Sequence, residues 1–395
     1  MALNTISSDR LSTNVKNTNF TAAEKQDLTD DILPLAGQLV NRNLIINGAM
    51  NVAQRGTSST ANTYGSVDRI RISSGGTDEA PTHSQADVAA ATTPYTSGFR
   101  KSLKITNGNQ TSGAGADDSI TFVYTVEDQD LATSGWNHKS SSSKITISFW
   151  VKSSVAQNFF FFLQSDNSSQ YRYVMETGSL SADTWTKITK TIPGNANLVF
   201  NNDNGVGVYI VWSIFRGTNS TGTRPLNAWA ALDNTSRTPD MTSTWYTTND
   251  ATFEITGVQL EVGSVATDFE HRSFAQELTL CKRYYQRYPE GPTADNYNCV
   301  PSAIMACNNT TTAYYCPTLN PTMRSSPSFS SSGNFRMNGT SSVNNVAVTA
   351  IGVYHNGAST PFQYASVASG LTAGQSVALS VNNDATAYIA YNSEL

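Results

Sequence analysis

The chain has 395 residues, a formal net charge of −5 and only 14% charged residues, against roughly 25% in an average globular protein. The acidic balance argues against a general nucleic-acid binder, and no apolar run approaches the roughly 18 residues of a membrane-spanning helix. The first ten residues lack the apolar stretch of a secretory signal. The sequence therefore predicts neither nucleic acid nor a membrane as partner.

Residues 1–38 are polar and too few to bury a core of their own. Thr21 and Glu24 form a capping-box pattern, which predicts a short helix that ends before Pro34. We expect an extended or helical N-terminal arm. Two interpretations stay open, namely a disordered tail and an attachment arm that becomes ordered on a partner.

Residues 39–272 alternate between short apolar runs and loops rich in Ser, Gly and Asn. Such spacing, with almost no helical period, predicts an all-β domain built as an antiparallel jelly-roll sandwich. The expected strands cover residues 43–48, 102–105, 119–125, 144–152, 158–163, 170–174, 185–192, 207–215 and 251–260. In the last of them the apolar alternation shifts by one position at Gly257, which predicts a β-bulge.

The sandwich is followed by a short predicted helix. Ser273 and Gln276 form a second capping box. The apolar positions of one helical stripe, expected to pack against the sandwich or around an oligomer axis, are Phe274, Leu278, Cys281, Tyr285 and Tyr288. We therefore assign residues 273–290 to a connecting helix and linker. Residues 291–395 form a smaller C-terminal β domain, whose polar strands at 303–307, 312–316, 341–350, 362–367, 376–381 and 385–391 would gain stability by oligomerising.

Catalytic and metal-binding motifs are missing from the sequence. The four histidines have no metal-ligand spacing, and there is no nucleophile elbow or phosphate-binding loop. The four cysteines form no CxxC pair and are expected to be reduced thiols. Asp117 and Asp118 are poor candidates for a glycosidase pair, because neighbours on a strand point to opposite faces. The sequence predicts a protein that is not an enzyme and has no cofactor.

One acidic cluster leaves two interpretations open. Glu127, Asp128 and Asp130 supply the oxygen ligands that calcium prefers, so a calcium site is one expectation. The cluster lacks the D-x-D-x-D-G spacing of a dedicated calcium-binding loop. A solvated acidic turn is the alternative.

Aromatic residues in loops are candidates for binding sugar rings. Trp136, Trp229, Trp245 and Tyr246 lie among turn-forming residues, and loops commonly carry binding sites. We expect them to form a glycan platform, with plugs at the ends of the sandwich as the alternative. The run of four phenylalanines at residues 159–162 is too apolar for exposure on both faces, so it indicates core or a subunit contact.

Several segments together resemble the tail-fibre or fibre-like virion proteins of tailed bacteriophages, especially marine and cyanobacterial ones. The most specific is ITGVQLEVGSVATDFEHRSFAQELTLCKRYYQRY at residues 255–288. The others are NLIINGAMNVAQRG at 43–56 with VDR at 67–69, EDQDL at 127–131, ITISFWVKSS at 145–154, MRSSPS at 323–328 and ATAYIAYNSEL at 385–395.

This resemblance implies a non-enzymatic, homotrimeric virion appendage with a jelly roll like that of carbohydrate-binding modules. It would be assembled in the host bacterial cytoplasm. Residues 1–38 would attach it to the phage tail, an adaptor or another virion protein, and the β domains would bind bacterial surface glycan. The alternatives are a purely structural head, neck or decoration protein without a receptor role, and a tailspike that degrades polysaccharide.

Overall fold

The computed structural model describes residues 41–167, 170–289, 299–339 and 344–395. The chain divides into two compact units, Met1–Arg42 and Asn43–Leu395. All the elements below belong to the second unit. The predicted arm of residues 1–38, including its capping box at Thr21, lies outside the described residues.

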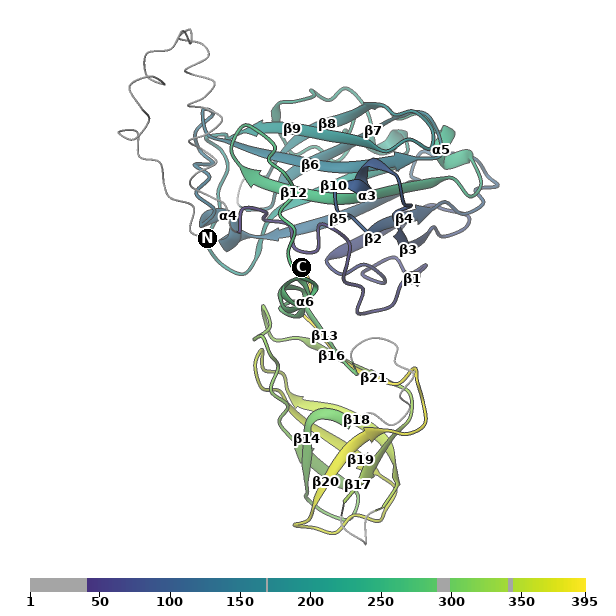
Figure 1. Ribbon diagram of the computed structural model, residues 1–395, viewed down its shortest axis with the longest axis vertical. Coiled ribbons are helices and arrows are strands. Elements are labelled where there is room, and N and C mark those ends of the chain that lie inside the picture. Colours follow the sequence, from purple (N-terminus) through teal and green to yellow (C-terminus); the bar gives the residue numbers. More distant parts are fainter. Residues whose placement is uncertain (1–40, 168–169, 290–298, 340–343) are drawn as a thin grey trace. The chain divides into compact units, whose positions relative to one another are not determined.

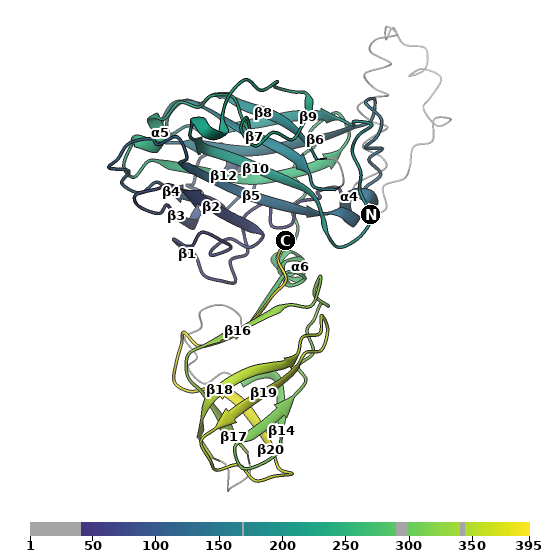
Figure 2. The ribbon, with the colours of Figure 1, turned by 180° about the vertical axis from the view of Figure 1, so that it is seen from behind.

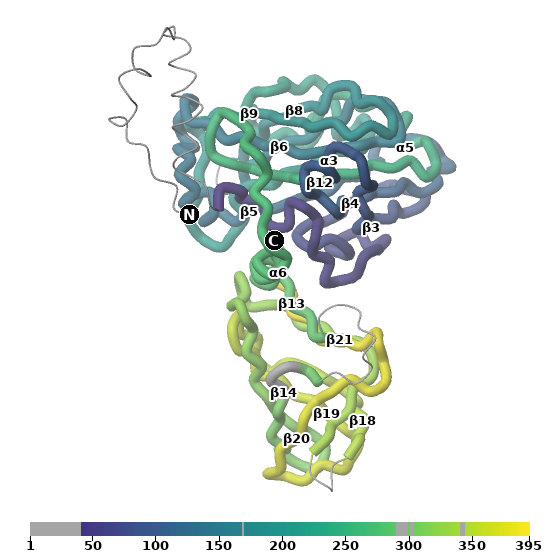
Figure 3. Tube along the Cα trace, viewed as in Figure 1, coloured from purple at the N-terminus to yellow at the C-terminus, as the bar shows by residue number. Residues whose placement is uncertain are grey.

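Residues 58–262 form a sandwich of two six-stranded antiparallel sheets (Figure 1). The first sheet has the order β1 (Ser58–Ser59), β3 (Thr82–Asp87), β4 (Lys101–Thr106), β12 (Thr252–Val262), β6 (Lys144–Ser153) and β9 (Thr186–Pro193). The second has the order β11 (Trp229–Ala231), β8 (Tyr171–Ser179), β7 (Asn158–Ser165), β10 (Val206–Arg216), β5 (Ser119–Glu127) and β2 (Ile70–Gly75). The colours of Figure 3 show that dark blue β4 lies beside green β12, a neighbour from a distant part of the chain. The predicted all-β class and sandwich are confirmed.

The four phenylalanines of β7 are buried on both faces of their sheet. Phe159 and Phe161 belong to the main core between the two sheets, whereas Phe160 and Phe162 belong to a separate apolar cluster. Successive side chains of a strand point to opposite faces, so the second cluster lies on the face turned away from the core. The run therefore contributes side chains to two apolar layers, one on each face of the sheet.

Strand β12 contains the predicted bulge. Its register against β6 shifts between Thr256 and Gln259. Gly257 has φ +62°, and a Cβ atom there would lie 2.6 Å from the Phe99 ring. The irregularity therefore requires glycine both for its backbone conformation and for the close approach of an aromatic side chain.

The expected strand at residues 43–48 is instead an extended segment that ends in a turn. Asn47 has φ 61°, and its side-chain oxygen accepts a hydrogen bond from the amide of Val52 at 2.9 Å. The Glu277 carboxylate also accepts a hydrogen bond from the backbone amide of Asn47. The Asn-Gly turn is therefore confirmed, but the segment is not a strand of the sheet. Backbone hydrogen bonds from the Leu44 amide to the Leu260 carbonyl and from the Val258 amide to the Gly48 carbonyl, both 2.9 Å, hold it against β12.

Helix α6 (Phe274–Lys282) begins with the predicted capping box, because Ser273 and Gln276 bond each other's backbone amides. The helix ends sooner than its apolar stripe indicated, since Tyr285 and Tyr288 lie on strand β13 (Tyr285–Tyr288). The buried members of the predicted stripe are Cys281 and Tyr285. Leu278 and Tyr288 are half-buried, and Phe274 is 58% exposed. The single helical face expected over residues 274–288 is thus corrected to a short helix followed by a strand.

The C-terminal region forms a closed six-stranded barrel and a separate three-stranded sheet. The barrel contains β14 (Cys299–Cys307), β15 (Thr312–Tyr315), β19 (Phe362–Val367), β18 (Val346–His355), β17 (Phe335–Asn338) and β20 (Ser376–Val381). The small sheet has the order β13, β21 (Tyr388–Asn392) and β16 (Ser328–Ser332). The remaining elements are the short helices α3 (Thr93–Thr96), α4 (Asp128–Ala132), α5 (Thr244–Thr247) and the 3-10 turn η1 (Thr218–Ser220).

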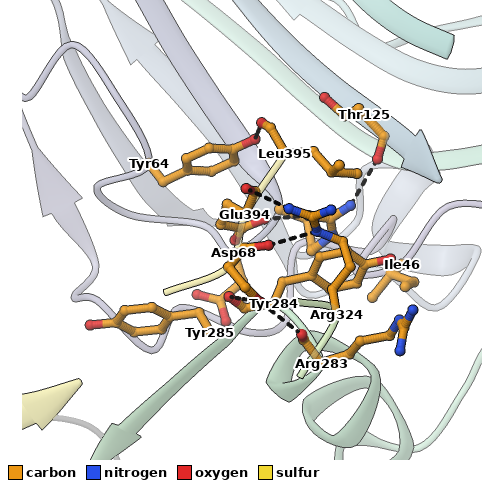
Figure 4. A network of polar contacts seen from close by, with 12 residues as sticks. Ile46, Tyr64, Asp68, Thr125, Arg283, Tyr284, Tyr285, Arg324, Glu394 and Leu395 are labelled. Atoms are coloured by element: carbon orange, nitrogen blue, oxygen red, sulfur yellow. Dashed lines mark hydrogen bonds and ion pairs between the residues drawn. The ribbon is translucent and has the colours of Figure 1, made fainter. Parts of the chain in front are cut away.

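A buried polar network connects this small sheet to the sandwich (Figure 4). The Arg69 guanidinium pairs with the Glu394 carboxylate, donates to the Thr125 carbonyl at 2.8 Å and lies 3.3 Å from the Tyr284 ring centroid. The Tyr64 hydroxyl donates to the Leu395 carbonyl at 2.7 Å. Segments that are distant in the sequence therefore share one electrostatic cluster.

The pKa values of two carboxylates of this cluster are shifted in opposite directions. Burial raises the pKa of Asp68 to about 6, although Arg55 and Gln54 oppose the shift. Burial alone would also raise the pKa of Glu127. Hydrogen bonds from Arg283 and Tyr284 outweigh that effect and hold it below its usual value. Glu127 is therefore a charged partner of Arg283 at neutral pH.

Candidate functional site

The outer face of the second sheet carries an apolar strip. The antiparallel registers place Phe162 opposite Val211, and Val211 opposite Val123. All three side chains belong to the cluster on the face turned away from the main core. This row of side chains, drawn from three neighbouring strands, forms the floor of a groove.

Polar rows lie on both sides of the strip. On one side Tyr209 is opposite Gln164 across β10 and β7. On the other side Ser73 is opposite Thr121 across β2 and β5. Since antiparallel pairing brings side chains on one face within about 5 Å of each other, the groove offers hydroxyls and amides next to an apolar floor.

The segments on either side of β11 supply further groove residues. Ser220 lies in η1 after β10, Asn234 and Arg237 follow β11, and the cavity has a volume of about 420 Å³. Figure 2 shows the sheet that carries the groove, with β7, β10 and β5 side by side. The remaining lining residues are Arg71, Asp117, Ser119 and Arg216. The volume lies within the range of about 300–1,000 Å³ that is common for ligand sites.

A buried arginine fixes part of the groove wall. Arg172 is fully buried, and its guanidinium donates two hydrogen bonds to the Gln164 side-chain oxygen, at 3.2 and 2.7 Å. The same guanidinium lies 4.5 Å from the Phe162 ring centroid and donates to the Asp233 carbonyl at 3.0 Å. Gln164 and Phe162 are therefore held in place without a ligand, as a preorganised binding surface requires.

The predicted glycan platform needs correction at three of its four residues. Trp136, Trp245 and Tyr246 are 3%, 0% and 1% exposed and pack in the main core of the sandwich. Tyr246 stacks on Phe215 with ring centroids 4.3 Å apart. Their ring faces are occupied by protein, so these residues plug the sandwich. Their position in loops of the sequence did not mean exposure.

Trp229, the fourth predicted platform residue, is half-buried. Its indole nitrogen donates to the Pro193 carbonyl at 2.7 Å, and its ring packs against Tyr173 with centroids 5.3 Å apart. It lies on β11 at the edge of the sheet and is not among the residues that line the groove. The structure thus does not bring the four predicted residues together.

The groove residues were not identified from the sequence. Tyr209 and Val211 alternate with core residues in β10, and Phe162 and Gln164 do so in β7. One available signal was the occurrence of polar or aromatic side chains on the outward-facing positions of otherwise apolar strands. The register that aligns these positions depends on tertiary structure.

The first sheet has a second cavity, of about 530 Å³, on its outer face. Phe99, Trp150 and His271 line it. Its rings pack largely on one another: Phe99 lies 4.9 Å from Phe269 and 5.1 Å from His271 between centroids. Three of its lining rings, Phe99, Phe269 and His271, therefore contact one another.

An aromatic cluster covers part of the outer barrel wall. Tyr354 is 51% exposed and lies 5.5 Å from Tyr314, 5.5 Å from Phe362 and 4.8 Å from Tyr364 between ring centroids. Exposed clustered rings are a second kind of surface that can contact a sugar or another protein. Tyr354 is a useful comparison residue for the groove.

The acidic cluster considered for calcium is divided among other contacts. Glu127 is bonded by Arg283, while Asp128 accepts hydrogen bonds from the Asn167 side chain and the Asn201 amide. Within the described ranges, no three His, Cys, Asp or Glu side chains gather to hold a metal ion. The described helices include none long and apolar enough to cross a membrane. The expected calcium site near Asp130 stays a prediction.

No family model matches the chain, and no curated protein matches it. Among solved structures it is similar to one described as "CBM4 structure and function", with 14% identity, 55% of this chain and 99% of that chain covered, and a TM-score of 0.29. It is also similar to a family 11 carbohydrate-binding module of a cellulosomal cellulase from Clostridium thermocellum. That match has 14% identity, covers 55% of this chain and 98% of that chain, and has a TM-score of 0.26.

A third similar structure is the enzymatically active domain of tailspike protein 4 from bacteriophage CBA120. The identity is 11%, the match covers 56% of this chain but 21% of that chain, and the TM-score is 0.30. Identities and TM-scores at this level carry no argument about function. The functional conclusion therefore rests on the chemistry of the groove.

Proposed function

We propose that this chain is a non-enzymatic protein that binds carbohydrate in the groove on the outer face of the second sheet. The observation that carries the proposal is the half-buried Tyr209 ring in a groove bordered by hydroxyl, amide and guanidinium groups, with Val123, Val211 and Phe162 as its largely buried apolar floor. Sugar rings present apolar C–H faces and hydroxyl edges, so a site of this composition complements both.

The single carboxylate among the described groove residues supports a binding role rather than hydrolysis. Glycosidases use two carboxyl groups on either side of the scissile bond. Among the described residues that line the groove, Asp117 is the one carboxylate, and it accepts a hydrogen bond from Asn219 at 2.8 Å. The composition supports recognition and positioning of a sugar.

Tyr209 provides the test of this proposal. Its half-buried ring lies in the groove beside Gln164. We expect Tyr209→Ala to weaken the best glycan from an array by about tenfold or more, as measured by calorimetry, because one stacking residue contributes about 1–2 kcal/mol. Tyr354→Ala on the barrel is the matched control and should keep full affinity. The reverse pattern would move the sugar site to the barrel.

We further infer that the sandwich serves as part of a phage fibre that forms a homotrimer and presents this groove to bacterial surface glycan. The support is the resemblance of residues 43–56, 255–288 and 385–395 to fibre proteins, together with the exposed Phe274 on α6, which another copy could cover. Binding by linked copies would strengthen weak single contacts through effective concentration. A structural head or neck protein is the alternative.

Particle incorporation tests the virion proposal. A chain that lacks residues 1–38 should remain a soluble oligomer but be absent from purified particles, because we assign attachment to that segment. The full chain, produced in parallel, is the control. Normal incorporation of the shortened chain would remove the attachment role, and immunogold labelling of the full chain on the head or neck would favour the structural alternative.

A further inference from the structure

The groove contains an excess of positive charge. Arg71, Arg216 and Arg237 line it, whereas Asp117 is the one carboxylate among the described lining residues. Across the described ranges, none of these three arginines forms a salt bridge. The cationic side chains therefore have no carboxylate partner of their own in the groove.

Arg216 is the most constrained of the three. It is only 8% exposed, and its Nε donates to the Ser213 hydroxyl at 2.9 Å. Its guanidinium lies 5.9 Å from the Phe162 ring centroid. These contacts fix the side chain at the groove floor, so it would not have to be ordered when a ligand arrives.

The arginines also oppose one another. Burial and the charge of Arg237 lower the pKa of Arg216 to about 9. Burial and the charges of Arg237, Arg224 and Arg216 likewise lower the pKa of Arg172, which lies behind Phe162, to about 9. Arg216 and Arg172 remain cationic at neutral pH. Placing several unpaired cations close together raises the free energy of the folded chain. Binding of an anion would lower it again, because the anion attracts these cations.

We propose that the groove binds an acidic glycan, whose oxyanion is held by Arg216 and Arg237 while its sugar ring contacts the half-buried Tyr209 ring beside the apolar strip. This inference rests on the proposed carbohydrate-binding function and narrows it to one class of ligand. The oxyanion chemistry is shared by the carboxylate of a uronic acid and by sulfate or phosphate esters. Guanidinium groups recognise all of these with paired, charge-assisted hydrogen bonds.

The remaining groove residues suit the rest of such a sugar. The Gln164 amide is held by Arg172, and Asn234 and Ser73 supply groups that can bond ring hydroxyls. Tyr209 offers a partly exposed ring next to them. The groove thus separates a cationic subsite from a subsite for neutral parts of the chain.

The experiment compares pairs of ligands that share one sugar backbone and differ in the anionic group. Calorimetry of the full chain would use oligogalacturonate and the same oligosaccharide fully methyl-esterified. A sulfated galactan oligosaccharide, its desulfated form, a phosphorylated mannan oligosaccharide and its dephosphorylated form complete the set. We expect at least one acidic member to bind about ten- to hundredfold more tightly than its neutral counterpart. The affinity should fall between 50 and 500 mM salt, since screening weakens the ion pairs.

Two variants locate the effect. Arg216→Gln and Arg237→Gln should each remove most of the preference for the acidic ligand. Arg100→Gln, at an exposed arginine outside the groove, is the matched control and should preserve the preference. The melting temperature of the ligand-free Arg216→Gln chain should stay the same or rise, because an unpaired buried charge has been removed. Arg237→Gln keeps the test valid if Arg216→Gln fails to fold.

The outcomes separate the two proposals. Equal binding of acidic and neutral members, unaffected by either variant, would overturn the acidic preference and leave carbohydrate binding in place. Tighter binding of the neutral members would do the same. If no oligosaccharide of the set binds, the proposed function itself fails. Loss of acidic binding in Arg100→Gln as well would place the ligand outside the groove.

Discussion

Replacing Arg69 by methionine should lower the free energy of unfolding by about 3–5 kcal/mol, the range for breaking a buried ion pair. Arg69 is 1% exposed and pairs with Glu394, whose side chain is 3% exposed. The variant would remove the nearest charge partner of a carboxylate that is closed off from water. It would also leave the Thr125 carbonyl without its donor and remove the cation from the Tyr284 ring.

Urea unfolding of purified variants measures this effect. Arg100→Met, at an exposed arginine that stacks on Tyr95, is the control and should change the stability by about 0.5 kcal/mol or less. The double variant with Glu394→Gln should recover part of the loss, because the second change removes a buried carboxylate that keeps only Arg55, at 3.3 Å, as a cationic partner. A loss below 1 kcal/mol for Arg69→Met would contradict the structural role assigned to the network.

Trp245→Ala should cost about 3–5 kcal/mol of stability, as large-to-small changes in a packed core do. The Trp245 ring is fully buried in the core, and its indole nitrogen donates to the Thr252 carbonyl at 3.0 Å. The variant would leave a cavity and remove one of the two hydrogen bonds that the Thr252 carbonyl accepts, the other coming from the Ser154 amide. The glycan affinity of the molecules that remain folded should be unchanged, because Trp245 does not line the groove.

Thermal and urea unfolding, combined with calorimetry below the transition, test this pair of expectations. Trp229→Ala is the matched control, since this tryptophan is only half-buried at the edge of the sheet. It should cost clearly less stability than Trp245→Ala. Full stability of Trp245→Ala together with lost sugar binding would restore the platform that the sequence predicted.

Features that depend on neighbours in the sequence were predictable. The bulge at Gly257 follows from a shift in alternation, and the capping box at Ser273 follows from residues three positions apart. The apolar run at 159–162 indicated burial on both faces for the same reason. In each case the pattern and the structural feature cover the same few residues, so no long-range information was needed.

Features that depend on strand register were not predictable. Phe162, Val211 and Val123 form one row only because β7, β10 and β5 pair in particular registers. The prediction that the helix extends to Tyr285 was wrong because that residue pairs with Asn392 on β21. The local sequence pattern contains no information about this long-range pairing. The burial of Trp245 was likewise not predictable from its position in a loop, because the core residues that cover it are distant in the sequence.

The pairing of Arg69 with Glu394 joins residues 325 positions apart, and Tyr64 with Leu395 joins residues 331 apart. Contacts at such separation form only after the entropy of closing a very long loop has been overcome, so they belong to late and slow steps of folding. Until strand β21 has paired with β13, the sandwich holds its arginine without the carboxylate partner. The sandwich and the small sheet are therefore linked by folding order, and removal of residues near position 394 would also destabilise the sandwich.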